Sequence, residues 1–257
     1  MTTAIAWIDG RWGTPGSLAL PLNDRGLQLA DGLFETVLVR RGAPMLLEEH
    51  LQRWQAGAEL LGLGAPPDRS MVSPLLTEAV QRSHSADAVL RLNWSRGGAG
   101  RGIDPPATGG ERFWLTLEPF EPLFSAVSTV ISRLEQRNAS SVLSRCKSFA
   151  YGQAIQARRE ARQRGTDDAL LRNTDGQLCC GTVANLLVHR HGTWLTPPVS
   201  SGCLPGVMRG ACLANGLAQE SDLDADLQRG DQALLINSLS CRPIHSVDGI
   251  ELSPIEE

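Results

Sequence analysis

The sequence predicts an α+β protein of two domains. Segments typical of strands and of helices are mixed without a regular strand-helix-strand rhythm, which argues against a parallel α/β sheet. The chain has 257 residues, long enough for two modest domains. Because Pro119 and Pro122 favour an extended connection, we expect a domain of residues 1–117, a linker of residues 118–124 and a domain of residues 125–257.

The first domain is predicted to contain several strands and one helix. Residues 7–12 form two short strands around an Asp-Gly turn, a turn type that needs positive φ. A β-rich run at 34–40 turns at 41–44 into an expected strand at 45–47. Apolar residues three and four apart predict a helix over 48–62. A strand, a glycine-rich loop and a further strand complete the domain at 88–95, 96–102 and 113–117.

The second domain is predicted to contain two helices among more strands. The first helix spans 149–164 and has alanines at three- and four-residue spacing. The second, over 206–214, follows a Pro-Gly turn directly. Strands are expected near 126–134, 168–172, 183–189, 194–198 and 233–237.

The composition excludes several classes of partner. The net charge is -4, and the arginines are scattered among acidic residues, so no nucleic-acid surface is expected. No basic leader precedes an apolar run, and no segment has the roughly 18 apolar residues of a membrane span. We therefore expect a cytoplasmic protein. The six cysteines and five histidines show no metal-ligand spacing, so we expect reduced thiols and no metal site.

Lys147 is the only lysine of the chain, since the other 23 of its 24 basic residues are arginines. It lies between a β-rich segment and a predicted helix. Guanidinium cannot replace an amine in imine chemistry, so a single retained amine indicates covalent chemistry at this position. A lysine at the surface is the alternative.

Two glycine-containing segments could hold anions. The turn at Pro205 and Gly206 places free backbone amides at the start of a helix, where the helix dipole also favours phosphate. In the loop at 96–102, glycines allow close approach while Arg96 and Arg101 offer planar donors for carboxylates. A simple helix start and a solvated loop are the alternatives. Dinucleotide, P-loop and serine-hydrolase motifs are missing.

With these features in this order along the chain, the sequence resembles the class IV (fold-type IV) pyridoxal-phosphate enzymes. This family includes branched-chain and D-amino-acid aminotransferases and aminodeoxychorismate lyase. The resemblance covers nearly the whole chain. It implies a small N-terminal α/β domain, a larger C-terminal α/β pseudobarrel domain that binds pyridoxal 5′-phosphate, an amino-acid-type substrate and a homodimer. The matching stretches are residues 8–10, 23–36, 50–53, 147–149, 160–161, 165–171, 185–186, 196–198, 204–209 and 243–244.

The resemblance also implies a role for individual residues. Lys147 would form the imine with the cofactor aldehyde and then move the proton at the substrate Cα. Arg53 would contact the cofactor phosphate. The backbone amides of Val207 and Met208, with Asn237 or Ser238, would complete the phosphate site, and Arg101, Arg96 and Phe34 would meet the substrate.

Cys180 departs from the pattern of the family. A glutamate of the family stands five residues before the asparagine of residues 185–186 and keeps the pyridine nitrogen protonated, whereas this chain has a thiol there. The ring should then be a weaker electron sink. Full transamination should suffer more than a lyase reaction, which gains the driving force of making an aromatic ring.

We therefore expect a lyase that converts 4-amino-4-deoxychorismate into 4-aminobenzoate and pyruvate for folate biosynthesis. The sequence of residues 237–239 and the end of the loop at 100–102 favour the same choice. A D-amino-acid or branched-chain aminotransferase is the first alternative. The second alternative is a homologue that binds the cofactor but has weakened turnover, and Cys180 is the only residue that suggests it.

Overall fold

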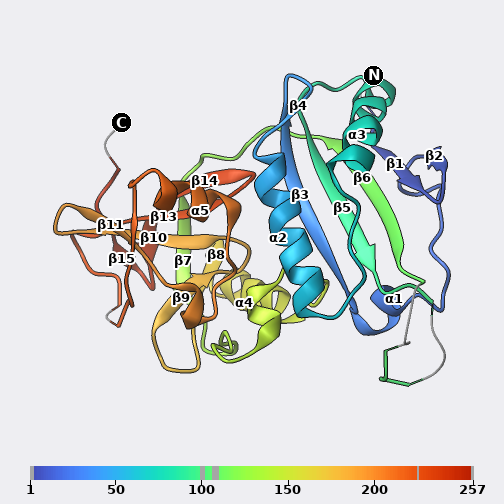
Figure 1. The fold of residues 1–257 in the computed structure, drawn as a ribbon. Coiled ribbons are helices and arrows are strands. Elements are labelled where there is room, and N and C mark those ends of the chain that lie inside the picture. Colours follow the sequence, from blue (N-terminus) through green and yellow to red (C-terminus); the bar gives the residue numbers. More distant parts are fainter. Residues whose placement is uncertain (1–2, 99–101, 106–109, 225, 256–257) are drawn as a thin grey trace. The chain divides into compact units, whose positions relative to one another are not determined.

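The computed structural model describes residues 3–98, 102–105, 110–224 and 226–255, and its contacts group the chain into two compact units (Figure 1). Unit 1 is Met1–Glu121 with Cys146–Ala150, and unit 2 is Pro122–Arg145 with Tyr151–Glu257. The expected domain boundaries stay a prediction. In this grouping the segment that carries Lys147 belongs to unit 1, although the chain on both sides of it belongs to unit 2.

Unit 1 is built on an antiparallel sheet of six strands in the order β2-β1-β6-β5-β3-β4. The strands are β1 (Ile5–Ile8), β2 (Arg11–Gly13), β3 (Gly32–Arg40), β4 (Ala43–Pro44), β5 (Ala88–Ser95) and β6 (Arg112–Pro119). The helices are α1 (Arg25–Leu29), α2 (Leu47–Leu60) and α3 (Arg69–Ser83).

The core of unit 1 lies between the sheet and the helices α2 and α3. Alternate residues of β3, including Leu33, Val37 and Val39, point to this side and pack with Trp54 of α2. Burial of each such side chain contributes about 1.5–3 kcal/mol to stability. Figure 1 shows α2 lying along β3. The other alternate residues of β3, beginning with Phe34, therefore point to the opposite face.

Unit 1 differs from the prediction in its helices and in one strand, and α1 was not predicted. The expected strand at 45–47 is wrong, because β4 is only Ala43–Pro44 and α2 already begins at Leu47. Leu46 has a φ of 52°, a left-handed conformation that interrupts the extended chain. The helix α3 was not predicted, and it contains Pro74, a residue type that usually ends or kinks a helix.

In its described residues, unit 2 is built on one sheet of nine strands with two helices. The strands are β7 (Val127–Ile131), β8 (Asp168–Arg172), β9 (Leu178–Gly181), β10 (Asn185–Arg190), β11 (Thr193–Thr196), β12 (Gln219–Glu220), β13 (Gln232–Asn237), β14 (Ser240–Val247) and β15 (Ile250–Glu251). The helices are α4 (Gly152–Gln163) and α5 (Val207–Ala214), with short 3₁₀ turns at Val142–Arg145 and Val199–Ser201.

Part of this sheet closes on itself. The pairings run from β10 through β13, β14, β7, β8 and β9 and return to β10, where Asn185 pairs with Cys180. The interior is filled by leucines such as Leu170, Leu186 and Leu235. Closure removes the free edges of these strands. It also brings Cys180 and Asn185 to the two ends of one tight turn.

The α+β class predicted from the sequence is confirmed. The first helix of unit 2 begins at Gly152, three residues later than predicted, because residues 147–149 pair with β3 instead. The strands β9 and β14 were not predicted. Among the described residues, no helix combines the length and the apolar character needed to cross a membrane.

Candidate active site

Lys147 is held against the edge of β3 by backbone hydrogen bonds. The Phe34 amide donates to the Lys147 carbonyl at 2.9 Å, and the Phe149 amide donates to the Gly32 carbonyl at 3.0 Å. Leu33 and Ser148 form an antiparallel bridge between them. The lysine therefore extends from a short strand-like segment whose position is fixed by the sheet of unit 1.

The Phe34 ring is in contact with two cationic groups. Lys147 Nζ is 4.3 Å from the ring centroid, and Arg91 Cζ is 3.6 Å from it. Both distances are in the range of cation–π attraction. Phe34 thus has a structural contact with Lys147, which the sequence could not show.

Arg91 was missed by the sequence reasoning. It lies on β5, between the buried residues Leu90 and Leu92, and its Nε donates to Asn93 Oδ1 at 2.8 Å. The alternating pattern of residues 88–95 contained the signal, because Arg91 and Asn93 occupy the positions that point away from the core. Because Arg91 contacts the same Phe34 ring as Lys147, its guanidinium is a candidate for binding an anion.

Gly32 is the residue that permits this arrangement. A Cβ atom there would lie 2.4 Å from the Phe149 ring and 2.7 Å from the Trp94 carbonyl oxygen. Neither distance is tolerated without movement of the Phe149 ring or of β5. The close approach of Phe149 to β3, and with it the place of Lys147, therefore requires glycine.

Arg53 belongs to a buried network of charged groups. Its Nε and Nη2 donate to Glu35 at 2.9 and 2.5 Å, and His50 Nδ1 lies 2.7 Å from Glu35 Oε2. Glu35 is fully buried. Burial would raise the pKa of Glu35, but the charge of Arg53 and the hydrogen bonds of His50 and Arg53 outweigh it and lower the pKa to about 2. The carboxylate is therefore charged at neutral pH.

Arg96 has an internal structural role. Its Nε donates to Asp31 at 2.7 Å, and its two terminal nitrogens donate to the carbonyls of Gly62 and Leu61 at the end of α2. These bonds satisfy carbonyls that a helix terminus leaves open. A contact of Arg96 with substrate stays a prediction. Arg101 lies outside the described residues.

In unit 2, Val207 and Met208 are the first two residues of α5, as the sequence predicted. The N-cap is Gly206, whose lack of a side chain leaves the first amides of the helix without a side-chain cap. A Cβ at Gly206 would lie 1.9 Å from Asn185 Oδ1, and Asn185 Nδ2 donates to the Leu204 carbonyl at 2.9 Å. Asn185 therefore fixes the turn that leads into α5.

Cys180 lies at the end of β9 and is 7% exposed. It is one of a group of thiols with Cys179 and Cys203. Hydrogen bonds with Cys180 and Cys203, together with burial, raise the pKa of Cys179. Cys180 thus belongs to a cluster of buried apolar residues and cysteines, and a thiol stands where the family has a glutamate.

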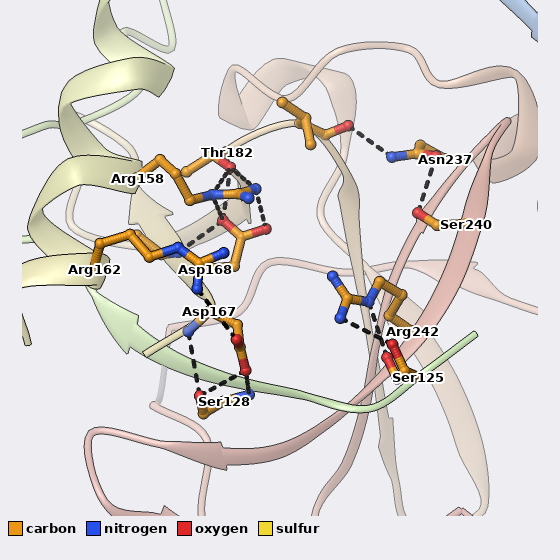
Figure 2. A network of polar contacts seen from close by, with 12 residues as sticks. Ser125, Ser128, Arg158, Arg162, Asp167, Asp168, Thr182, Asn237, Ser240 and Arg242 are labelled. Atoms are coloured by element: carbon orange, nitrogen blue, oxygen red, sulfur yellow. Dashed lines mark hydrogen bonds and ion pairs between the residues drawn. The ribbon is translucent and has the colours of Figure 1, made fainter. Parts of the chain in front are cut away.

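The turn between Cys180 and Asn185 is held from two sides (Figure 2). Thr182 Oγ1 donates to Asp168 at 2.6 Å and accepts from Arg158 of α4 at 2.5 Å. From the other side, Asn237 Nδ2 donates to the Val183 carbonyl at 3.2 Å. Asn237 and Ser238 lie at the end of β13, and the Asn237 side chain is used to hold this turn.

The residues present fit the parts of pyridoxal phosphate. Taken by itself, unit 1 has an amine at Lys147, which suits an aldehyde, and a guanidinium at Arg53, which Glu35 holds in one orientation and which suits a phosphate. Taken by itself, unit 2 has amides without a side-chain cap at the start of α5, where the helix dipole also favours a phosphate. The thiol of Cys180 differs from the carboxylate that the family provides for the pyridine nitrogen.

Comparisons with known proteins agree with this donor set. Residues 32–247 match the family model described as amino-transferase class IV. A Schizosaccharomyces pombe protein named "Putative aminodeoxychorismate lyase" is 33% identical over 80% of this chain and 85% of its own. A Mycobacterium tuberculosis protein named "Bifunctional aminodeoxychorismate lyase / D-amino acid transaminase" is 26% identical over 98% of this chain and 95% of its own.

A solved structure shares the fold over nearly the whole chain. It is described as "A hypothetical aminotransferase from Mycobacterium tuberculosis, PLP-bound form", and it matches with a TM-score of 0.80 and 24% identity. The match covers 98% of this chain and 93% of that one.

Proposed function

Since the chain belongs to the class IV aminotransferase family, whose members are pyridoxal-phosphate enzymes, we propose that it is an aminodeoxychorismate lyase. The reaction would convert 4-amino-4-deoxychorismate into 4-aminobenzoate and pyruvate, a step of folate biosynthesis. The observation that carries this choice is the buried thiol of Cys180, which stands in the position of the family's carboxylate and belongs to a cluster of apolar residues and cysteines. Relatives named as such lyases support it.

In this proposal, the cofactor supplies an aldehyde that condenses with amines and a ring that accepts electrons from the substrate Cα. Lys147 Nζ would hold the aldehyde and would then take the proton from the substrate carbon that bears the amine. That proton would pass to the departing enolpyruvate, which becomes pyruvate as its C–O bond to the ring breaks, because this carbon carries no hydrogen in 4-aminobenzoate. As the family resemblance implies, Arg53 would contact the phosphate, and the backbone amides of Val207 and Met208, with Asn237 or Ser238, would complete the phosphate site.

We infer that Arg91 is a further carboxylate receptor. The substrate carries two carboxylates, and Arg91 stands over the same Phe34 ring as Lys147. Its guanidinium can bind a carboxylate with two parallel hydrogen bonds. Arg101, as the sequence predicts, would serve the second carboxylate.

The thiol at position 180 favours elimination over transamination. Without a carboxylate partner, the pyridine nitrogen loses an ion pair that would favour its protonated form. A transaminase must stabilise the Cα carbanion in both half-reactions, whereas the lyase gains the formation of an aromatic ring. The weaker electron sink should therefore cost the lyase less.

Two assays on the purified enzyme test the choice. We expect pyruvate and 4-aminobenzoate to appear in equal amounts from aminodeoxychorismate, with little keto acid formed from D-alanine or leucine. If only D-alanine or leucine is turned over, the protein is an aminotransferase and the lyase proposal is wrong. The name of the Mycobacterium tuberculosis relative supports an aminotransferase as the second candidate. A protein that binds the cofactor but converts none of these would be the weakened homologue.

Replacing Cys180 by glutamate should change the balance of the two activities. In Cys180→Glu, a carboxylate can pair with the pyridine nitrogen, so keto-acid formation from D-alanine should rise about tenfold, equivalent to about 1.4 kcal/mol of barrier. Pyruvate release from aminodeoxychorismate should change less. Both rates are measured under single-turnover conditions.

Cys180→Ser is the matched control, because it changes the polar atom without adding charge. It should leave the ratio of the two activities as in the unmodified enzyme. An equal loss of both activities in Cys180→Glu, at unchanged thermal stability, would contradict the role of this position.

We also propose that the enzyme is a cytoplasmic homodimer. Leu27 and Leu29 of α1 and Ile103, whose carbonyl accepts a hydrogen bond from Arg25, are 58%, 51% and 83% exposed. Neighbouring exposed apolar side chains are typical of association surfaces. Light scattering should give twice the mass of one chain.

A further inference from the structure

We propose that Glu35 and His50 are positioning residues that fix the guanidinium of Arg53 for binding of the cofactor phosphate. This inference rests on the proposed function, in which Arg53 is a phosphate ligand. It adds one residue of β3 and one of α2 that the sequence did not place in the site.

The geometry of the Arg53 and Glu35 contact fixes one orientation of the guanidinium. Two nitrogens on one edge of the planar group, Nε and Nη2, bond to the two oxygens of the Glu35 carboxylate. A planar fork held at two points cannot rotate about its own axis. The edge with Nη1 is consequently turned away from Glu35.

His50 fixes the carboxylate in turn. Its Nδ1 lies 2.7 Å from Oε2, the same oxygen that Arg53 Nη2 reaches at 2.5 Å. His50 and Arg53 are three residues apart on α2, so they point from the same side of that helix. Glu35 comes from β3, and the network therefore joins the helix to the sheet.

The network is shielded from water, which makes its orientation effective. Glu35 is 0% and His50 1% exposed, whereas the Arg53 side chain is 11% exposed. An arginine held only by solvent would lose rotamer freedom on each binding event. The Arg53 side chain has already lost this rotamer freedom on folding, so binding of a phosphate does not have to order it again.

The affinities of the apo-protein for pyridoxal phosphate and for pyridoxal test the proposal. The two ligands have the same aldehyde and ring. The dissociation constant of pyridoxal divided by that of pyridoxal phosphate therefore measures the contribution of the phosphate, and a lower ratio means a weaker phosphate contact. Glu35→Gln should lower this ratio about tenfold, the range expected when a charge-assisted hydrogen bond is lost. The affinity for pyridoxal should stay within twofold. Arg53→Lys should lower the ratio by at least as much.

Combination of the two substitutions distinguishes positioning from independent contributions. If Glu35 acts through Arg53, the Glu35→Gln/Arg53→Lys variant should be no weaker than Arg53→Lys alone. His50→Phe should lower the ratio about threefold. Glu48→Gln, on the exposed side of the same helix, is the control and should leave the ratio unchanged.

The contrary results are separable. Equal weakening of both ligands in Glu35→Gln would show a role only in folding and would overturn the proposal. If Glu35→Gln does not fold, Glu35→Asp keeps the charge with a shorter reach, and an unchanged ratio in that variant would overturn it as well. If the unmodified protein binds pyridoxal as tightly as pyridoxal phosphate, the phosphate site of the proposed function itself fails.

Discussion

Replacement of Lys147 by alanine is expected to abolish covalent attachment of the cofactor and to reduce turnover at least about 10³-fold. No other side chain of the protein carries an aliphatic amine, because Lys147 is its only lysine. Borohydride reduction of the unmodified enzyme should fix the cofactor at this residue. Cleavage after Arg145 and Arg158 then releases one labelled peptide of residues 146–158, which mass spectrometry identifies.

Lys147→Arg is the matched variant. It keeps a cation near the Phe34 ring, whose centroid is 4.3 Å from the lysine nitrogen, but it removes the amine. Its stability should stay near that of the unmodified protein while activity is lost. A covalent label on another peptide, or a chromophore that remains covalently bound in Lys147→Ala, would refute the assignment of this residue.

Arg53→Leu is expected to have the largest effect on stability. It leaves the Glu35 carboxylate charged and fully buried beside His50, and loss of one partner of a buried ion pair costs about 3–5 kcal/mol. Urea unfolding of the apo-protein at pH 7.5 measures this cost without a contribution from cofactor binding.

A second substitution should recover part of that cost. In Glu35→Gln/Arg53→Leu the buried group is neutral and can still bond to His50, so about 2 kcal/mol should return. If the double variant is less stable than Arg53→Leu, the instability comes from lost packing of the arginine side chain.

The effect of pH has a defined sign. In the unmodified protein the pKa of Glu35 is lowered to about 2, so its stabilisation is present above the unfolded value of 4.5 and is lost only as the pH falls through 2. In Arg53→Leu, burial dominates and should raise the pKa of this carboxyl. Its destabilisation should then be largest at alkaline pH and shrink as the pH is lowered to 5.

The role proposed for Lys147 comes from the sequence, because it depends on the side chain alone. An amine is required for imine chemistry, and the chain has only one lysine. The start of the helix near Val207 could also be predicted from the sequence, since a Pro-Gly turn before an apolar run is a local signal. The strand at 45–47 failed for a local reason too, because the left-handed conformation of Leu46 is unusual for leucine.

Arg96 shows where sequence reasoning ends. Its position in a glycine-rich loop suggested a substrate ligand, but its donors bond to Asp31 and to carbonyls at the end of α2. Those acceptors lie more than 30 residues away along the chain. No pattern within the loop could have shown that they use the guanidinium.

The sequence by itself determined the α+β class, the single amine and the thiol at position 180, because each follows from local periodicity or from side-chain chemistry. Only the tertiary structure decided that residues 147–149 pair with β3, that Cys180 meets Asn185 where the sheet closes, and that Glu35 contacts Arg53. The physical reason is that, in an unfolded chain, each hydrogen-bond donor can reach many acceptors. Packing of distant segments selects the one it keeps.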